Sequence, residues 1–260
     1  MMWVMNPTEV ENESLSLGEI GYESLEAYVK ELQNLLGEDK NRYHLLVGGG
    51  DSGQIVVKLA KLVYEHLGLE CPPVLLLPTF RHSDYEETIP FDNSQLPTPE
   101  GFDGSVIQNV LFLDDEIGSG STAKGTLQWL RLHAPYLNKY TIVAEDGGFV
   151  WDEEVPDVTV KFVPTKKQRE NVFNAISYII PSDFEKPVQE ALADTPDLND
   201  KQVMCVLLGL PTKEFNDSRP HFTNALYEIA KAKLPNLGSL QAGYQDYFAK
   251  QVSSILEDSK

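Results

Sequence analysis

The sequence predicts an α/β fold: a mainly parallel, twisted sheet of about five strands with helices on both faces, followed by a helical C-terminal region. Three observations predict it. Short apolar runs alternate with amphipathic stretches over residues 21–180, which is typical of parallel strands joined by helices. Two glycine-rich turns join an apolar run directly to an amphipathic one. Residues 181–260 continue with helical periodicity and no strand-like alternation, whereas residues 1–20 form a polar, acidic lead-in.

The first elements are expected to be a helix and a strand that leads into a glycine-rich loop. Apolar residues, Tyr28 among them, recur at helical spacing from the candidate cap Ser24 to the stop Gly37. The apolar run YHLLV predicts a strand, and the loop GGGDSG at 48–53 follows it. The amphipathic stretch QIVVKLAKLVYEHLG then predicts a second helix that ends at Gly68.

A second apolar strand, PPVLLLPTF, precedes a long polar segment, residues 81–104. This segment is rich in Pro, Asp, Ser and Gly, and connections of such length in compact domains are usually functional lids or disordered. The remaining core elements expected are a strand at 110–113, a helix that opens near residue 118, and strands at 140–145 and 158–163. Further helical stretches follow between residues 183 and 258.

The charge of the chain excludes several classes of partner. Its 260 residues include 40 acidic and 21 basic side chains, which gives a formal net charge of -19. Such a surface repels nucleic acid and anionic membranes, and no apolar run approaches the roughly 20 residues that span a bilayer. Two distant cysteines, Cys71 and Cys205, form no disulfide framework or metal motif. Because the acidic N-terminal segment does not resemble a signal peptide, we expect a cytoplasmic protein.

The strongest chemical signal is VLFLDDEIGSGSTAKGTL, residues 110–127. Asp114 and Asp115 follow an apolar strand, at the edge where open α/β sheets bind ligands. The glycine-rich turn after them opens into a helix, whose free N–H groups suit a phosphate together with the Ser and Thr hydroxyls of the turn. The two carboxylates suit a vicinal diol, or Mg²⁺ held through water. A phosphate-binding turn beside two carboxylates that can bind a diol is the arrangement expected of a ribose 5-phosphate site.

This stretch resembles the signature that binds phosphoribosyl pyrophosphate (PRPP) in type I phosphoribosyltransferases: four apolar residues, two acidic residues, three variable residues and then Thr/Ser-Gly-x-Thr. The resemblance implies a core of the type I phosphoribosyltransferase kind over residues 21–180. It also implies that Asp114 and Asp115, as the catalytic carboxylates, contact the ribose hydroxyls and hold Mg²⁺ through water. The residues that it implies for the 5-phosphate are Gly118, Ser119, Gly120, Ser121 and Thr122.

The same resemblance gives roles to two other segments. In the family, the first core strand ends in a loop that binds the pyrophosphate of PRPP, and the second ends before a long loop that closes over the active site. The pyrophosphate-binding residues implied here are Gly49, Gly50, Asp51, Ser52, Gly53 and Arg81. Closure of residues 81–104 would exclude water and suppress hydrolysis of PRPP.

The chain departs from the family pattern at three places. Gly118 stands where 6-oxopurine transferases have an Asp that contacts the base, which argues against hypoxanthine or guanine. The segment after Arg81 and His82 is acidic, whereas many members have basic residues there. Asp51 adds a further negative charge beside the expected pyrophosphate. Mg²⁺ could compensate, or a partner subunit could supply the cations.

Three functions fit these features. The first is a PRPP-dependent phosphoribosyltransferase, a glycosyltransferase of nucleotide metabolism that transfers ribose 5-phosphate to a nucleobase or another nitrogen nucleophile; the resemblance also implies a homodimer. The second is a non-catalytic protein that binds PRPP or a nucleotide and acts by regulation or through a partner. The third, an NADP-dependent oxidoreductase, depends on Gly48, Gly50 and Gly53 as G-x-G-x-x-G, with Arg81 for a 2′-phosphate. It leaves residues 110–127 unexplained.

Overall fold

The structure of the chain, a computed structural model, describes residues 16–38, 43–79, 108–117, 121–135, 137–146, 157–164, 175–216 and 219–258. In chain order its elements are α1 (Leu17–Glu38), β1 (Leu45–Gly49), α2 (Gly50–His66), β2 (Val74–Leu77), β3 (Gln108–Ile117), α3 (Ser121–His133), β4 (Leu137–Asp146), β5 (Val158–Val163), the 3₁₀ helix η2 (Ala175–Ile179), α4 (Ser182–Ala191), α5 (Asp200–Leu208), β6 (Thr212–Asn216), β7 (Arg219–Thr223), α6 (Ala225–Lys233) and α7 (Leu237–Asp258).

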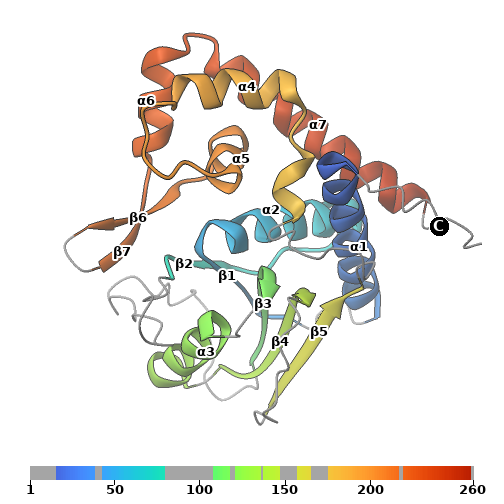
Figure 1. Cartoon of the computed structure of the whole chain (residues 1–260). Helices are drawn as coiled ribbons and strands as arrows, with labels where there is room; N and C mark the ends of the chain where they lie inside the picture. The colour runs from blue at the N-terminus through green and yellow to red at the C-terminus, as the bar shows by residue number, and fades with distance from the viewer. Residues whose placement is uncertain are drawn as a thin grey trace, which may run out of the picture.

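Five parallel strands form the central sheet in the order β2-β1-β3-β4-β5, which confirms the predicted parallel sheet (Figure 1). Because β2 and β3 lie on opposite sides of β1, the direction in which strands are added reverses at this point. The chain segments that leave the carboxyl ends of β1 and β3 therefore diverge there. Open α/β sheets bind their ligands in the crevice that such a divergence creates.

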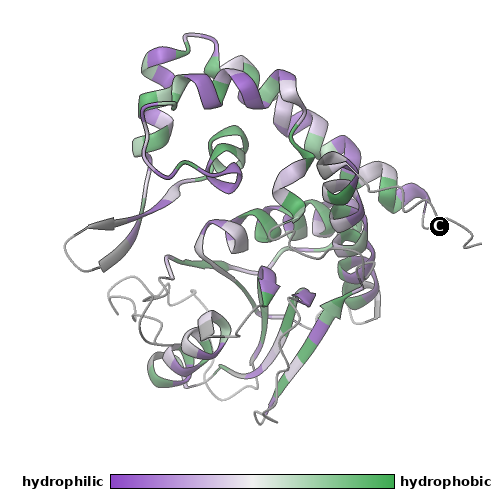
Figure 2. Cartoon of the chain, viewed as in Figure 1, coloured by the Kyte–Doolittle hydropathy of each residue, from purple (hydrophilic) through white to green (hydrophobic). Residues whose placement is uncertain are grey.

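Helices cover both faces of the sheet, as predicted (Figure 1). Side chains alternate along β1: Leu45 and Val47 belong to the apolar cluster with α3, whereas Leu46 belongs to the cluster with α1 and α2. Figure 2 shows hydrophobic residues along α2 and the inner strands, where the layers meet. Among the helices that the structure describes, none has the length and apolar character needed to cross a membrane.

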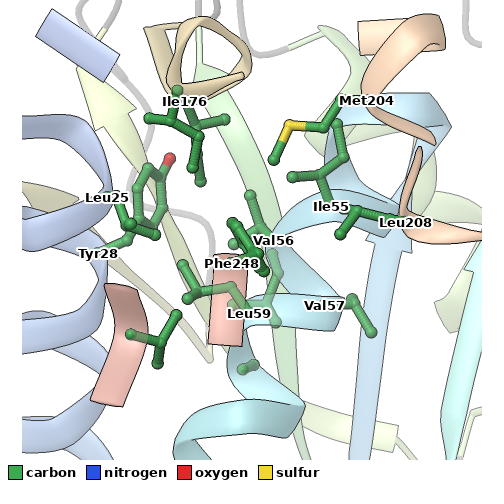
Figure 3. Packing of buried hydrophobic residues seen from close by; sticks show 14 of the residues in the cluster. Leu25, Tyr28, Ile55, Val56, Val57, Leu59, Ile176, Met204, Leu208 and Phe248 are labelled. Carbon is green, nitrogen blue, oxygen red and sulfur yellow. The ribbon is translucent and has the colours of Figure 1, made fainter. Parts of the chain in front are cut away.

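The C-terminal helices pack on α2 and α1 and extend the apolar cluster of that face. Figure 3 shows side chains of α1, α2, η2, α5 and α7 in this shared cluster, among them Leu25, Tyr28, Ile55, Val56, Leu59, Ile176, Met204, Leu208 and Phe248. The helix α2 is therefore buried between the sheet and the C-terminal region. This packing brings the C-terminal region next to the glycine loop, from which α2 starts.

The C-terminal region is helical, as predicted, but it also contains an antiparallel hairpin that the sequence alone did not predict. The strands β6 and β7 pair from Thr212 opposite Thr223 to Asn216 opposite Arg219. Both strands are short and mostly polar, and β7 contains Pro220, so no apolar alternation marks them in the sequence.

The helix α5, which precedes this hairpin, is held at both ends. At its start, Asn199 and Gln202 form a capping box, in which each side chain bonds the backbone N–H of the other residue. At its end, Gly209 has a φ of 71°, and Gln241 and Gln245 of α7 donate hydrogen bonds to carbonyl oxygens of the last turn. These contacts determine where α5 begins and where the chain enters β6.

The helix α1 begins earlier than the sequence predicted. Ser16 and Glu19 cap its first turn: the Glu19 N–H donates to Ser16 Oγ (3.3 Å), and the Glu19 carboxylate accepts the Ser16 N–H (2.8 Å). The prediction of Ser24 as the cap is therefore wrong. Ser24 lies buried inside the helix, where its hydroxyl donates to the carboxylate of Glu145 at the end of β4.

Candidate functional site

The glycine loop joins β1 to α2 without an intervening residue, since β1 ends at Gly49 and α2 begins at Gly50. Gly48 and Gly53 pack so closely that a Cβ on Gly48 would lie 2.7 Å from the Gly53 carbonyl oxygen. Gly50 has a φ of 65°, a conformation that residues with a side chain rarely adopt. These glycines bring the start of α2, which no side chain caps, directly to the carboxyl end of β1.

Asp51, in the first turn of α2, faces the C-terminal region. Its carboxylate accepts a hydrogen bond from the backbone N–H of Lys213 in β6, over 2.6 Å. Burial raises the pKa of Asp51, while that N–H and the charges of Lys213 and Lys201 oppose the rise. Asp51 therefore connects the glycine loop to the hairpin, a residue 162 positions away in the sequence.

Asp114 and Asp115 lie near the end of β3, where the pairing with β4 shifts register between Leu113 and Glu116. Both are buried, with 6% and 5% of their surface exposed. The Asp114 carboxylate accepts hydrogen bonds from the Ser52 hydroxyl (3.2 Å) and from the Asp115 N–H (3.0 Å). The structure thus brings the acidic pair and the glycine loop into direct contact.

The two buried carboxylates form few hydrogen bonds or ion pairs with the described residues. Asp115 Oδ2 lies 3.5 Å from Lys201 Nζ of α5, but it accepts no hydrogen bond within the part of the chain that the structure describes. Burial and then the charge of Asp115 raise the pKa of Asp114 well above its usual range, and Lys201 opposes the rise. An oxygen with unused lone pairs is suited to accept a hydrogen bond from a ligand.

Tyr28 of α1 holds the backbone of the acidic pair. Its hydroxyl donates to the carbonyl oxygens of Asp114 (2.8 Å) and Asp115 (2.5 Å), which share its one proton, and accepts the Glu145 N–H (2.9 Å). The register shift takes both carbonyls out of the regular ladder with β4, and the hydroxyl acts as their partner instead. From the sequence, Tyr28 was one more apolar position of a helix. The periodicity contains no signal for this polar role.

The turn predicted to hold a 5-phosphate lies between the end of β3 at Ile117 and the start of α3 at Ser121. This is the order of strand, turn and helix that the motif requires. Thr122 lies half-buried in the first turn of α3. The predicted site residues outside the described ranges are Gly118, Ser119, Gly120 and Arg81, as is the segment 81–104.

Two lysines of the C-terminal region lie at this edge of the sheet. Lys201 faces Asp115, and Lys213 lies on the glycine loop, where a Cβ on Gly50 would be 3.9 Å from its Nζ. Burial lowers the pKa of Lys213, and the charge of Asp51 opposes this shift. The sequence pointed to Mg²⁺ or a partner subunit as sources of positive charge. The structure supplies two cations from the same chain.

The acidic pair is also a candidate site for Mg²⁺. Within the described residues, no three His, Cys, Asp or Glu side chains gather as ligands of one metal ion. Asp114 and Asp115 supply two carboxylates, and Asp115 Oδ2 has capacity left. Mg²⁺ is usually bound through one or two carboxylates together with water and substrate phosphates. The pair therefore fits a magnesium ion shared with a bound phosphate, and does not fit a site made of protein ligands alone.

The comparisons with known proteins found similarity in structure only, since no protein-family model and no curated protein sequence matches the chain. One similar structure is a hypothetical protein from Neisseria gonorrhoeae with bound ppGpp, with a TM-score of 0.37 and 17% identity over 53% of this chain and 82% of that chain. A hypoxanthine phosphoribosyltransferase from Trypanosoma cruzi, in complex with the product IMP, gives a TM-score of 0.38 and 11% identity over 65% and 86%. A hypoxanthine phosphoribosyltransferase from Staphylococcus aureus gives a TM-score of 0.34 and 17% identity over 58% of this chain and 85% of that chain.

Proposed function

We propose that this protein binds PRPP and transfers its ribose 5-phosphate to a nitrogen nucleophile, with release of pyrophosphate. One observation carries the proposal: the Ser52 hydroxyl of the glycine loop bonds the Asp114 carboxylate over 3.2 Å. A helix start suited to an anion and a carboxylate pair suited to a diol therefore adjoin at the switch point of the sheet. PRPP carries its diphosphate next to a ribose diol, so it would contact both motifs at once.

The proposed roles follow from the chemistry of each group. The N–H groups at the start of α2, within residues 49–53, bind the diphosphate, and Arg81 is proposed as a further ligand of it. Asp114 and Asp115 accept hydrogen bonds from the ribose hydroxyls. The turn at 118–122 and the start of α3 bind the 5-phosphate. Nothing in this scheme requires a covalent intermediate on the protein.

In the proposed reaction, the bond between ribose C1 and the diphosphate oxygen breaks, and its electron pair leaves with pyrophosphate. The nitrogen nucleophile forms the new bond to C1 and then loses its proton. Positive charge develops on the ribose as the diphosphate departs, so nearby carboxylates stabilise it, and the start of α2 stabilises the leaving anion. Mg²⁺ bound with the substrate at Asp114 and Asp115 would add to the neutralisation of the leaving group.

Binding without turnover is the second candidate, and the contact between Lys201 and Asp115 favours it. Asp115 is 5% exposed, and its carboxylate lies 3.5 Å from Lys201 Nζ before any ligand arrives. A ribose hydroxyl must therefore compete with Lys201 for Asp115. A site of this kind can report ligand binding through the movement of α5 without catalysing a transfer.

The test is calorimetric titration with PRPP and Mg²⁺, combined with a pyrophosphate-release assay over a panel of nucleobases. Asp115→Asn replaces a charged acceptor, whose hydrogen bond contributes about 1.5–3 kcal/mol, with a neutral one that contributes about 1 kcal/mol, so affinity for PRPP should fall about 3- to 30-fold. Asp246→Asn is the matched control, because Asp246 is exposed on α7 and pairs with Lys250 there; it should leave affinity unchanged.

The outcomes separate the candidates. Release of pyrophosphate with a nucleobase supports the transferase. Binding of PRPP without release for every base tested supports the binding protein. Absence of PRPP binding by the wild-type protein refutes both.

A further inference from the structure

Lys213 lies in an environment that is unusual for a lysine. Its side chain is half-buried, with Nζ 3.9 Å from the position of a Cβ on Gly50. Within the described ranges, no carboxylate oxygen lies within 4.0 Å of that Nζ. A partly buried ammonium group without a close counter-charge costs stability. Its presence at the glycine loop therefore needs a reason other than packing.

Asp51 explains where Lys213 lies but not what its charge does. The Asp51 carboxylate accepts the backbone N–H of Lys213 at 2.6 Å, so it holds β6 against the start of α2. The ammonium group itself forms no ion pair with Asp51 within 4.0 Å. Burial lowers the pKa of Lys213, although the charges of Asp51 and Asp114 oppose the shift. The ammonium group remains available to a ligand.

A second unsatisfied group lies on the other side of the same site. Asp115 Oδ2, on a residue that is 5% exposed, accepts no hydrogen bond in the described part of the chain. Among the described residues, the site thus has a lysine with no carboxylate oxygen within 4.0 Å at the glycine loop, and at the acidic pair a carboxylate oxygen that accepts no hydrogen bond although Lys201 Nζ lies 3.5 Å away. These two features are complementary to a ligand that is anionic at one end and hydroxylated at the other.

We propose that Lys213 is a specificity-determining residue, whose ammonium group binds the diphosphate of the ligand at the start of α2. The C-terminal hairpin then adds to the positive charge of Arg81, since the rest of the segment 81–104 is mostly acidic. This inference rests on the proposed function for the identity of the rest of the ligand. Because Lys213 lies at the glycine loop, it favours a diphosphate over a ligand that carries only the 5-phosphate.

The role of Asp51 in this arrangement has two opposed parts. Its carboxylate positions Lys213 through the backbone, which favours binding, and its negative charge repels the diphosphate, which opposes binding. An asparagine at position 51 would keep an oxygen that accepts the Lys213 N–H and would remove the charge. Asp51→Asn is therefore expected to strengthen the binding of pyrophosphate.

The experiment titrates inorganic pyrophosphate, PRPP and ribose 5-phosphate, each with Mg²⁺, into the wild type and four variants. Lys213→Met removes the charge but keeps an unbranched side chain; we expect affinity for pyrophosphate and PRPP to fall about tenfold or more, and affinity for ribose 5-phosphate to change less than about twofold. Lys213→Arg should keep most of the affinity. Asp51→Asn should raise pyrophosphate affinity about threefold. Lys250→Met, an exposed lysine of α7, should change none of the three.

Thermal melts check that each variant is folded. Equal pyrophosphate affinity in the wild type and Lys213→Met overturns the inference, even when PRPP binds through Asp115. Absence of pyrophosphate binding by the wild type also overturns it. A tenfold loss of pyrophosphate affinity in Lys213→Met supports the inference, whether or not PRPP binds. Absence of PRPP binding by the wild type overturns only the proposed function.

Discussion

Lys201 is the described cation nearest to the acidic pair. Its removal tests whether its charge offsets the repulsion between the Asp114 and Asp115 carboxylates. Lys201→Met would leave Asp114 and Asp115 buried without the ammonium group that lies 3.5 Å from Asp115 Oδ2. We expect this variant to be less stable at neutral pH. We expect Lys201→Met combined with Asp115→Asn to recover most of the loss, because the double variant removes both partners of the pair.

The geometry gives the size of the effect. At 3.5 Å, an effective dielectric constant of about 20 gives an attraction of about 5 kcal/mol. The Lys201 side chain is 25% exposed, so solvent screens part of this attraction. Loss of one partner of a fully buried ion pair costs about 3–5 kcal/mol of stability. We therefore expect a loss of about 2–3 kcal/mol for Lys201→Met, or about 5–10 °C in Tm for a chain of this size. The coupling energy in the double-mutant cycle should be about 2 kcal/mol.

The assay is urea denaturation of the wild type, both single variants and the double variant, at about pH 7.5 and about pH 5.5. The pKa of Asp114 is raised in the folded protein, first by burial and then by Asp115, and Lys201 opposes this rise. A carboxyl with a raised pKa destabilises the folded state above that pKa, and the penalty disappears as the pH falls through it. The defect of Lys201→Met should therefore be smaller at the lower pH. Additive losses in the cycle, or a defect that grows on acidification, would refute this reasoning. Lys30→Met, which breaks an exposed pair on α1, is the control and should cost less than about 0.5 kcal/mol.

Two further variants test the contacts that position the site. Tyr28→Phe removes the hydroxyl that donates to the carbonyl oxygens of Asp114 and Asp115. It should lower the free energy of unfolding in urea by about 1–3 kcal/mol and weaken PRPP binding. A purely apolar role for Tyr28 would leave stability and PRPP affinity unchanged. Gly53→Ala places a Cβ 2.8 Å from the Gly48 carbonyl carbon, a backbone atom that no side-chain rotation can move aside, so thermal melts should show a loss of about 1–3 kcal/mol. Gly37→Ala should give a slight gain, because its Cβ would meet no described atom within 4 Å beyond its chain neighbours and its own helix backbone.

The central sheet and the glycine loop at 48–53 could be predicted from the sequence because their signals are local. Four apolar residues before Asp114 mark a buried strand, and the glycines mark the points at which a helix starts close to a strand end. The alternation of such segments implies parallel strands, and parallel strands bring their carboxyl ends to one edge. The contact between Ser52 and Asp114 follows from this topology, although the two motifs are 62 residues apart.

The residues that surround these motifs could not be predicted in the same way. Tyr28 has the spacing of a core residue, and only the register shift in β3 gives its hydroxyl a polar role. Lys201 and Lys213 belong to the C-terminal region, and their positions depend on the packing of α5 on α2. Such contacts depend on how layers stack, and neither composition nor periodicity contains that information. The hairpin was missed for a different reason, since its strands lack the apolar alternation that marks a strand.

The charged side chains of the site come from both the α/β core and the C-terminal region. The described side chains that meet here are three carboxylates, Asp51, Asp114 and Asp115, and two lysines, Lys201 and Lys213, so their formal sum is one negative charge. A diphosphate adds more negative charge to a largely buried place, where repulsion is weakly screened. The helix start of α2 offsets only part of this, since it acts as about half a positive charge. For the proposed diphosphate, the two lysines would offset the remaining repulsion. Because both come from the C-terminal region, the α/β core by itself would present three carboxylates to the ligand, and we infer that the core and the C-terminal region form one binding site.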